Sequence, residues 1–365
     1  MWVRMASLES IAFQLGVSKA TISRAFDPRY CHKVRQETRQ RIFELCERLS
    51  YHPTFTGRSF STGRTYKIGL IAQHENPPIF SPIRMLCLHS LSRTAQEHGY
   101  AVTLLDFEDR DASIKISEFL RSSIADGYVI FSHLIDERAQ EAILNCGKPV
   151  LSIDFLQRGK DGIPVVYRDC IPAYREAWSA LPRDFRNSTA WVQVGDSDYK
   201  YRMLLQAAPE NVTVSRLFLG DSLDNYLLNY RNDHRLAMAH LDELRKYRML
   251  WCASDMQALA VADAFRENGI EPGKDVWIVG FDNIEGTTAG KHEQFLSTVD
   301  PCWNDFGARL GQMLLEKIEN GREMPMSTAF PSRFIFRKSF PGKPHQGGQG
   351  CSEEKGLAGS SPSQS

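Results

Sequence analysis

The sequence predicts a small all-α head at the N-terminus followed by a larger α/β body. The chain of 365 residues exceeds a single ordinary domain and is 42% hydrophobic, which is enough for a sizeable core. Two short amphipathic segments joined by a glycine open the chain, whereas apolar runs alternate with helical segments from residue 67 onward. Residues 1–66 hold 11 Lys and Arg against 5 Asp and Glu, and residues 67–365 hold 33 against 39. A chain of zero net charge therefore divides into a basic head and an acidic body.

Two helices joined by a tight turn are predicted between Ser7 and Phe26. Ser7 is placed to cap the first helix, and Gly16 turns the chain toward Ser18, a second candidate cap. The second helix would bury Ile22 and Phe26. The apolar residues of the first helix recur at i, i+3, i+4 and i+7: Leu8, Ile11, Ala12 and Leu15. This is helix-turn-helix geometry. Any small helical bundle can contain two such helices, but the positive charge of the head favours the neutralisation of DNA phosphates.

A third helix is expected in VRQETRQRIFELCERLSY, and it should close a three-helix core. Pro53 stops this helix, and the Ser/Thr/Gly-rich stretch TFTGRSFSTGRTY reads as a flexible basic linker. One face of the helix carries Thr38, Ile42, Leu45, Cys46 and Leu49.

The body alternates strand-like apolar runs with segments long enough for crossover helices, which predicts βαβ repetition and parallel strands. More than 270 residues of this alternation exceed one comfortable sheet, so two sheets are expected. The runs are IGLIA, YAVTLLD, GYVIF, PVLSIDF, VVYRD, AWVQVG, VSRLFLG, RMLWCAS and VWIVGFD.

The residue patterns of common enzymes are missing from the chain. GxGxxG after a strand, GxxxxGK[ST], GxSxG and HExxH do not occur, and the eight cysteines form no CxxC pair or Cys/His ligand spacing. We therefore expect no enzyme, no cofactor and no metal site. No apolar run reaches the roughly 18 residues of a membrane span, so a cytoplasmic protein with reduced thiols is expected. After Phe340 the Gly/Ser/Pro/Gln-rich tail should be disordered and offers no leucine heptads, which leaves a dimer formed through the body.

Four motifs together resemble the lactose-repressor (LacI/GalR) family of transcription regulators. They are GVSKATISRAF, VRQETRQRI, LSYHP followed by GRSF, and TYKIGLI. The resemblance covers roughly residues 6–340 and implies a body of two Rossmann-like subdomains of the periplasmic-binding-protein type I. The chain would cross between them near Val165–Asp169, Ser297–Pro301 and Pro325–Phe334. It also implies a helix-turn-helix domain at 1–52, a hinge at 53–66, an effector-binding and dimerisation domain at 67–340, and a tail at 341–365.

The same resemblance implies how the head would bind double-stranded operator DNA and associate with the nucleoid. Base edges would face Lys19, Ala20 and Arg24, because the second helix of the family enters the major groove. Arg24 can present a bidentate fork to guanine. Phe60 would occupy the place of a leucine that wedges into the minor groove, with Arg58 on the backbone beside it, although Gly57 departs from the usual Ala. Phosphate contacts or support would come from Ser18, Thr21, Ser23, Thr38 and Arg39.

Polar residues that follow the body strands are candidates for a small-molecule site, because open α/β sheets bind ligands at the carboxyl ends of their strands. An Arg with several carboxylates would suit a polyhydroxylated effector such as a sugar. Asp255 and Asp282 could instead cap helices, and the aromatic YKY segment at 199–201 could stack on a sugar or lie on an exposed helix surface. Each of these residues matches a family effector position: Asp169, Arg202, Ser254, Asp255 and Asp282, with Phe80 as an apolar lid.

The resemblance thus implies a ligand-responsive repressor that binds a palindromic operator as a homodimer. Two alternatives remain open. One is a solute-binding protein without a transcriptional role. The other is a DNA-binding regulator whose pocket has decayed and which answers to a protein partner, since Ser254-Asp255 replaces the usual Asn-Asp and EQFLSTV replaces PPLTTV.

Overall fold

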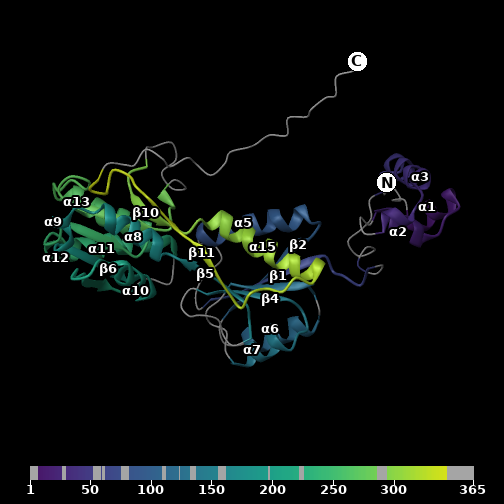
Figure 1. The fold of residues 1–365 in the computed structure, drawn as a ribbon, viewed down its shortest axis with the longest axis horizontal. Coiled ribbons are helices and arrows are strands. Elements are labelled where there is room, and N and C mark those ends of the chain that lie inside the picture. The colour runs from purple at the N-terminus through teal and green to yellow at the C-terminus, as the bar shows by residue number, and fades with distance from the viewer. Residues whose placement is uncertain are drawn as a thin grey trace, which may run out of the picture.

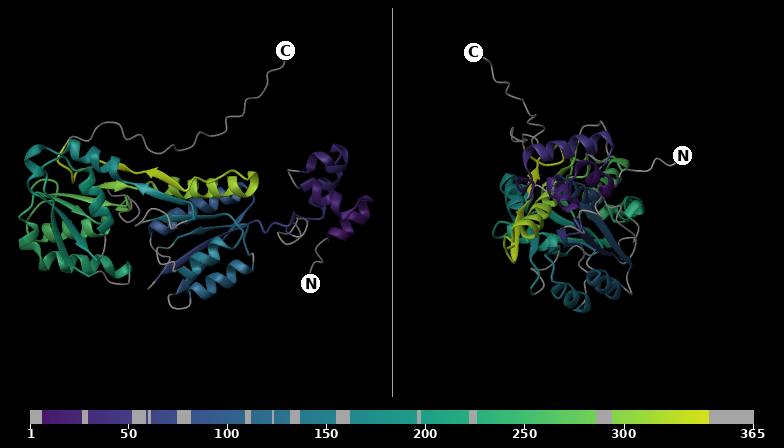
Figure 2. Two further views of the ribbon diagram at one scale, coloured as in Figure 1. Left: turned by 60° about the horizontal axis from the view of Figure 1, so that its bottom comes forward. Right: turned by 90° about the vertical axis from the view of Figure 1, so that its right-hand side faces the viewer.

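The computed structural model describes residues 7–26, 30–51, 59, 62–74, 82–108, 112–122, 124–131, 137–154, 162–195, 198–221, 226–285 and 294–342. These ranges form a helical head and a body of two sheets, the arrangement that the sequence predicts (Figure 1). The head lies off the end of the first sheet, on the side away from the second sheet, in Figure 1 and in the left view of Figure 2.

The head is a three-helix unit with a short 3₁₀ turn. Ser7 and Ser10 form a reciprocal capping box at the start of the first helix, and Gly16 ends it with a left-handed φ of 64°. Ile11, Ile22 and Ile42 come from three different helices and meet, fully buried, at the centre of the core. The elements are α1 (Leu8–Leu15), α2 (Lys19–Phe26), η1 (Cys31–Lys33) and α3 (Gln36–Arg48).

The first sheet is six-stranded and parallel, in the order β11-β5-β4-β3-β1-β2. Helices α5 and α15 cover one face and α6 and α7 the other (Figure 1). Gly307 lets α15 approach α5 closely, because a Cβ atom there would lie 2.3 Å from the carbonyl oxygen of Cys87. The elements are β1 (Lys67–His74), α5 (Pro82–Glu97), β2 (Ala101–Glu108), α6 (Ala112–Arg121), β3 (Gly127–Ile130), α7 (Glu137–Leu144), β4 (Val150–Asp154), β5 (Val165–Asp169), α15 (Trp303–Asn320) and β11 (Ser327–Pro331).

The second sheet has the order β12-β10-β9-β8-β6-β7, with only β12 antiparallel to its neighbour. Trp178, Trp191 and Trp251 are fully buried in the core on one face of this sheet. The elements are α8 (Ile171–Ala180), α9 (Arg183–Arg186), β6 (Thr189–Val194), α10 (Asp198–Ala207), β7 (Ser215–Gly220), α11 (Tyr226–Ala239), α12 (Leu241–Leu244), β8 (Met249–Cys252), α13 (Asp255–Glu267), β9 (Trp277–Phe281), β10 (Ser297–Asp300) and β12 (Arg333–Ile335).

The chain crosses between the two sheets three times, after β5, after β10 and after β11. The crossings fall where the sequence predicts them, and all nine apolar runs of the body form strands. Since the carboxyl ends of parallel strands in both sheets point toward these crossings, the residues that follow the strands meet there.

Candidate functional sites in the head and at the subdomain junction

Helix α2 presents a polar surface next to its buried face. Lys19, Ala20 and Arg24 are exposed, whereas Thr21 and Ser23 are half-buried. Ile22 and Ala25 point into the core and fix the rotation of the helix. The three side chains expected at base edges therefore share the solvent side of a helix whose orientation the core determines.

Side-chain hydrogen bonds hold the N-terminal turn of α2. The hydroxyl of Ser18 accepts a hydrogen bond from the backbone N–H of Thr21 at 3.1 Å and bonds to the hydroxyl of Thr21 at 2.9 Å. Lys19 is paired with Glu9 of α1, and this hydrogen bond lowers the pKa of Glu9. Both side chains of this ion pair are exposed, so the pair is weak and leaves Lys19 available to other acceptors.

The remaining head residues of the predicted interface lie on α3 or in the linker. Thr38 and Arg39 are half-buried, and the guanidinium of Arg39 lies 5.7 Å from the ring centre of Phe43. Arg58 and Phe60 lie outside the described residues.

A group of charged and aromatic side chains meets where the strands of both sheets end. We call Arg168, Tyr199, Lys200, Asp282 and Trp303 the junction cluster. Lys200 donates to the carbonyl of Ala253 at 2.7 Å, and its ammonium lies 3.9 Å from a carboxylate oxygen of Asp282. The guanidinium of Arg168 lies 4.6 Å from the ring centre of Trp303 and donates to the hydroxyl of Tyr199 at 3.3 Å. The cluster joins β5 and α15 of the first subdomain to α10 and the residue after β9 in the second.

Asp282 is a buried carboxylate on an unusual backbone. Its φ of 105° and the φ of 54° at Asn283 both lie in the region that favours glycine. Burial raises the pKa of Asp282, while Lys200 and Arg168 act in the opposite direction. Strained backbone and a perturbed carboxylate together are typical of a functional site.

The structure does not place Arg202 with the acids that the sequence analysis assigned to it. Its side chain is 64% exposed and pairs with Asp198 of the same helix at 3.4 Å. The reason is helical phase, because Lys200, Leu204 and Ala207 occupy the buried face of α10 and Arg202 lies off it. Lys200 therefore stands where the arginine was expected. Arg168 and Trp303 also belong to the cluster and were not predicted from the sequence.

The other predicted ligand residues are engaged within the protein. Asp169 accepts from the backbone N–H of Ile171 at 3.1 Å at the start of α8, and Ser254 accepts from that of Gln257 at 3.2 Å. Asp255 caps no helix. It is fully buried, and it accepts hydrogen bonds from the backbone N–H of Ile284 at 2.7 Å and the hydroxyl of Thr298 at 2.6 Å. Phe80 lies outside the described residues.

Neither ring of the YKY segment is free helix surface. Tyr201 is half-buried, donates to the carbonyl of Val214 at 3.1 Å and packs 6.0 Å from the ring centre of Trp191. Tyr199 accepts from Arg168, so it is the tyrosine that belongs to the junction.

Replacing Asp255 by Asn should flatten the pH dependence of stability. Burial raises the pKa of Asp255 to about 7. A carboxyl whose folded-state pKa lies above its unfolded value contributes stability below the unfolded pKa, near 4, and this is lost as the pH rises through 7. Asn keeps the shape and can accept from Ile284. We expect Asp255→Asn to unfold with a free energy about 1 kcal/mol higher than the parent at pH 8, and with no gain at pH 4, in urea titrations. An equal change at both pH values would contradict the assignment.

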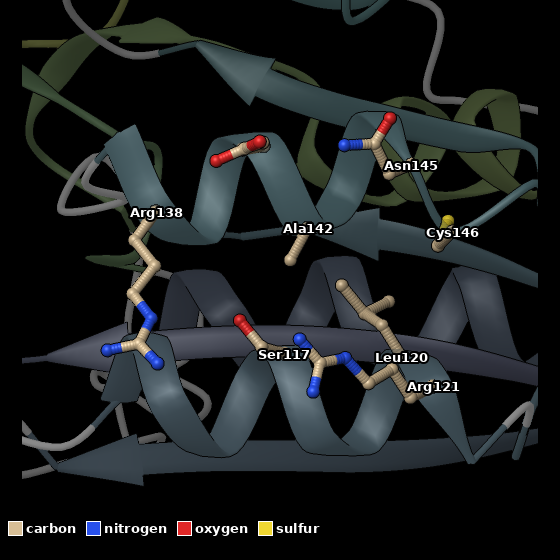
Figure 3. A pocket seen from close by; sticks show the side chains of 8 residues that line it. Ser117, Leu120, Arg121, Arg138, Ala142, Asn145 and Cys146 are labelled. Atoms are coloured by element: carbon tan, nitrogen blue, oxygen red, sulfur yellow. The ribbon is translucent and has the colours of Figure 1, made fainter.

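A polar groove between α6 and α7 is separate from the junction cluster. It has a volume of about 360 Å³, and Arg121 and Arg138 project into it on either side of Ser117 (Figure 3). Glu141 also lines the groove, so it contains both signs of charge. None of the residues predicted to bind DNA or effector lines it.

Within the described ranges, no three His, Cys, Asp or Glu side chains gather closely enough to hold a metal ion. No helix in the same part of the chain is both long and apolar enough to cross a lipid bilayer.

Known proteins match both parts of the chain. Residues 7–54 match the family of bacterial regulatory proteins of the lacI type, and residues 224–340 match a periplasmic binding protein-like domain. The transcriptional regulator RegA of Clostridium saccharobutylicum is 25% identical over 87% of this chain and 94% of its own length. Catabolite control protein A of Staphylococcus xylosus is 26% identical over 91% and 98%. The lac repressor dimer bound to operator and the anti-inducer ONPF superimposes with a TM-score of 0.69, at 18% identity, over 92% of this chain and 99% of that one.

A helix-turn-helix head joined to a two-sheet body defines a class of DNA-binding transcription regulators that carry a domain of the kind that binds small molecules. The head is a domain of the lacI family of bacterial regulatory proteins, and the whole chain is similar to regulators of this type. Its relatives are regulators and not enzymes, as the missing catalytic motifs predict.

Proposed function

We propose that this protein is a repressor that binds a palindromic operator as a homodimer, with its affinity set by a small polar molecule bound at the junction of the two sheets. The observation that carries the proposal is that one chain holds both a helix with exposed polar side chains in the head and a charged cluster at the junction of the body. The solvent side of α2 offers Lys19, Ala20 and Arg24, and the junction cluster brings charged groups of both subdomains together. We assign the head to residues 1–52, the hinge to 53–66, the effector-binding and dimerisation domain to 67–340 and the tail to 341–365.

In this proposal α2 reads bases in the major groove. Lys19 and Arg24 supply the donors, and Ala20 supplies only an apolar surface, such as one for a thymine methyl. Hydroxyls of Ser18, Thr21, Ser23 and Thr38, with Arg39 and Arg58, contact or support contacts to the phosphates. Phe60 inserts at a central base step. An effector can change operator affinity only by its differential affinity for two arrangements of the body.

Arg24→Ala should lower affinity for the cognate operator by roughly 1–3 kcal/mol and affinity for random DNA much less, because a bidentate contact to a base discriminates sequence. Arg48→Ala is the matched control, since Arg48 is equally an exposed head arginine but lies in the last turn of α3. Fluorescence anisotropy on both DNAs measures the two losses. Equal losses on operator and random DNA for Arg24→Ala would make Arg24 a phosphate contact instead.

The test of operator binding is selection of bound sequences from random double-stranded DNA with the full-length protein. We expect an enriched motif of two inverted half-sites, because the symmetry of the operator mirrors that of a dimer. Enrichment of a single half-site, or of no motif, would refute the homodimeric repressor.

The effector is proposed to be a polar metabolite that contacts Arg168, Tyr199, Lys200, Asp169 and Asp282. Asp255 is fully buried and bonded to Ile284 and Thr298, and Ser254 caps α13, so we assign these two residues to support of the site. The solved complex of the regulator CelR with cellobiose, at a TM-score of 0.59 and 20% identity, is an example of a sugar bound by the same fold. Thermal-shift screening of sugars, sugar acids and purines tests the assignment, because a ligand at about 100 times its dissociation constant stabilises its protein by roughly 2.7 kcal/mol.

Control by a protein partner is the second candidate. The observation that favours it is that polar side chains at the junction already form hydrogen bonds within the protein, which leaves fewer of them for a ligand. These side chains are Lys200, Ser254 and Asp255. A ligand screen without a hit, together with operator binding that changes on addition of a cell extract, would favour this candidate.

A further inference from the structure

Asp300 lies at the point where two of the three crossings leave the second sheet. β10 ends at Asp300 and the chain then enters α15 of the first subdomain, while β12 begins at Arg333 on its return from β11. Asp300 and Arg333 are direct register partners in the antiparallel β10–β12 pair. A contact between them therefore ties the second crossing to the third.

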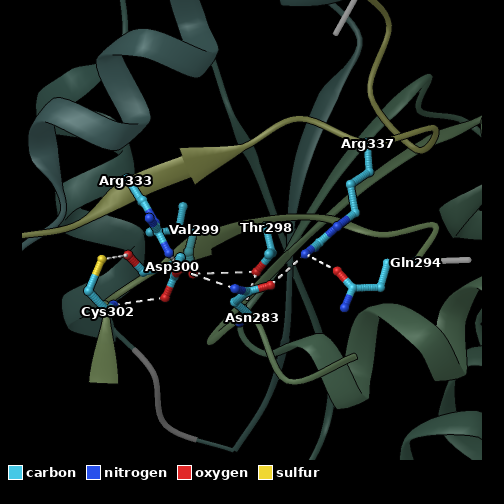
Figure 4. A network of polar contacts seen from close by, with 8 residues as sticks. All are labelled: Asn283, Gln294, Thr298, Val299, Asp300, Cys302, Arg333 and Arg337. Carbon is cyan, nitrogen blue, oxygen red and sulfur yellow. Dashed lines mark hydrogen bonds and ion pairs between the residues drawn. The ribbon is translucent and has the colours of Figure 1, made fainter. Parts of the chain in front are cut away.

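The carboxylate of Asp300 accepts hydrogen bonds from three separate segments (Figure 4). One oxygen accepts from Arg333 Nε at 3.0 Å and Nη2 at 2.8 Å, and from Asn283 Nδ2 at 3.1 Å. The other oxygen accepts from the backbone N–H of Cys302 at 2.8 Å. The side chain of Asp300 is only 6% exposed, so these contacts are shielded from water and are stronger than surface ones.

Asp300 is connected to the junction cluster through Asn283. Asn283 follows Asp282 directly in the chain. Its side-chain amide is held on the other side by Arg337, whose Nη2 donates to Asn283 Oδ1 at 2.7 Å. Asp282 and Asn283 both have positive φ angles, and the hydrogen bonds of Asn283 to Asp300 and Arg337 help to maintain this backbone. Cys302, at the start of α15, also has a positive φ, of 53°. Asp300 thus bonds both to Asn283, the residue after Asp282, and to Cys302, at the start of the second crossing. Movement of either segment therefore changes the hydrogen bonds of the Asp300 carboxylate.

Hydrogen bonds also connect the first crossing to the third. Ser332 donates from its backbone N–H to the carbonyl of Asp169 at 2.9 Å, and its hydroxyl lies 3.2 Å from the thiol sulfur of Cys170. All three crossings are thus linked side by side, and Asp300 also contacts the loop of Asp282 through Asn283.

We infer that Asp300 is a positioning residue that sets the relative arrangement of the two subdomains and transmits a change at Asp282 to the crossings. It need not touch the effector. A ligand that replaces Lys200 as the partner of Asp282 shifts Asn283, and this alters the hydrogen bonds that Asp300 makes to Arg333 and Cys302. Hinge residues of this kind absorb the backbone rotation when two domains move. The link to DNA binding rests on the proposed function, whereas the arrangement of the subdomains does not.

The test is a distance measurement across the junction in the full-length protein. Spin labels are attached to a ketone-bearing amino acid introduced at the exposed positions Glu118 and Lys246, because the eight native cysteines preclude thiol labelling. Arg333→Met removes the fork that holds Asp300, at a side chain that is 44% exposed, so the chain should still fold. We expect its distance distribution to shift or broaden relative to the parent. Arg333→Lys, which keeps the charge but not the fork, should restore it in part.

Arg245→Met is the matched control, because it removes an exposed ion pair to Asp242 in the second subdomain, away from the crossings. Its distribution should equal that of the parent. A lower melting temperature of Arg333→Met with an unchanged distribution would overturn the inference, since a purely structural role predicts that result. Operator affinity of the same variants separates the two proposals: a shifted distribution with unchanged affinity would leave the role of Asp300 intact and refute its coupling to DNA.

Discussion

Ile42→Ala should abolish operator binding while the body stays folded. Ile42 lies fully buried between the three helices of the head and contributes to a core of very few residues. Truncation of a buried isoleucine costs about 2–5 kcal/mol. A head of this size has a total stability of roughly 2–7 kcal/mol at 0.05–0.15 kcal/mol per residue. The substitution therefore removes most of what keeps the head folded, and a gel-shift titration should find no specific complex.

The matched control is Ile116→Ala, which deletes the same atoms from a fully buried isoleucine of α6 in the body. It should lower the unfolding temperature of the body and leave the head able to bind DNA. Circular dichroism of the Ile42→Ala protein should keep the body transition. Operator binding by Ile42→Ala at parental affinity would mean that the head gains its stability from contacts outside its own core.

Local signals in the sequence were sufficient for the head and for the strands of the body. The capping serine Ser7, the turn at Gly16 and the apolar periodicity each act within a few residues, and the structure has a capping box and a left-handed glycine at these positions. The nine apolar runs became strands for the same reason, because a parallel strand covered on both faces needs a continuous apolar segment.

The junction cluster could be predicted only in part. Asp282 follows a strand, and that rule placed it correctly at the carboxyl edge of the second sheet. Lys200 was missed because the choice between it and Arg202 depends on the phase of one helix, and the signal was the buried series Lys200, Leu204 and Ala207. Arg168 lies on the same face of β5 as Val166, so in the sequence it is a single polar residue on a core face. Its partner Trp303 comes from a distant helix. Tertiary contacts of this kind leave no local trace in a single sequence.

Lys200→Met should destabilise the body, and the loss should grow with pH. The side chain of Lys200 is only 11% exposed, and its ammonium lies 3.9 Å from the buried carboxylate of Asp282. Removal of one member of a buried pair leaves the other without compensation, which costs roughly 3–5 kcal/mol in well-formed pairs. At a separation of 3.9 Å, and with Arg168 still nearby, we expect the lower end of this range, about 3 kcal/mol at pH 8.

The pH dependence follows from the direction of the pKa of Asp282. Burial already raises this pKa, and loss of Lys200 removes an opposing influence, so the variant's Asp282 titrates at still higher pH. Such a group contributes stability below its unfolded pKa and loses it as the pH rises through the folded value. The difference in unfolding free energy between parent and variant should therefore be small at pH 4 to 5 and largest at pH 8. Urea titrations at both ends measure it.

The double variant Lys200→Met with Asp282→Asn decides which interaction is responsible. If the uncompensated carboxylate causes the loss, the added Asn removes the charge, and the double variant should be more stable at pH 8 than Lys200→Met alone and nearly independent of pH. If instead the loss comes from the bond of Lys200 to Ala253 and its packing on the ring of Phe281, 3.9 Å away, the two variants should be equally unstable at every pH. That result would remove Asp282 from the centre of the junction and leave Lys200 as a packing residue of the second subdomain.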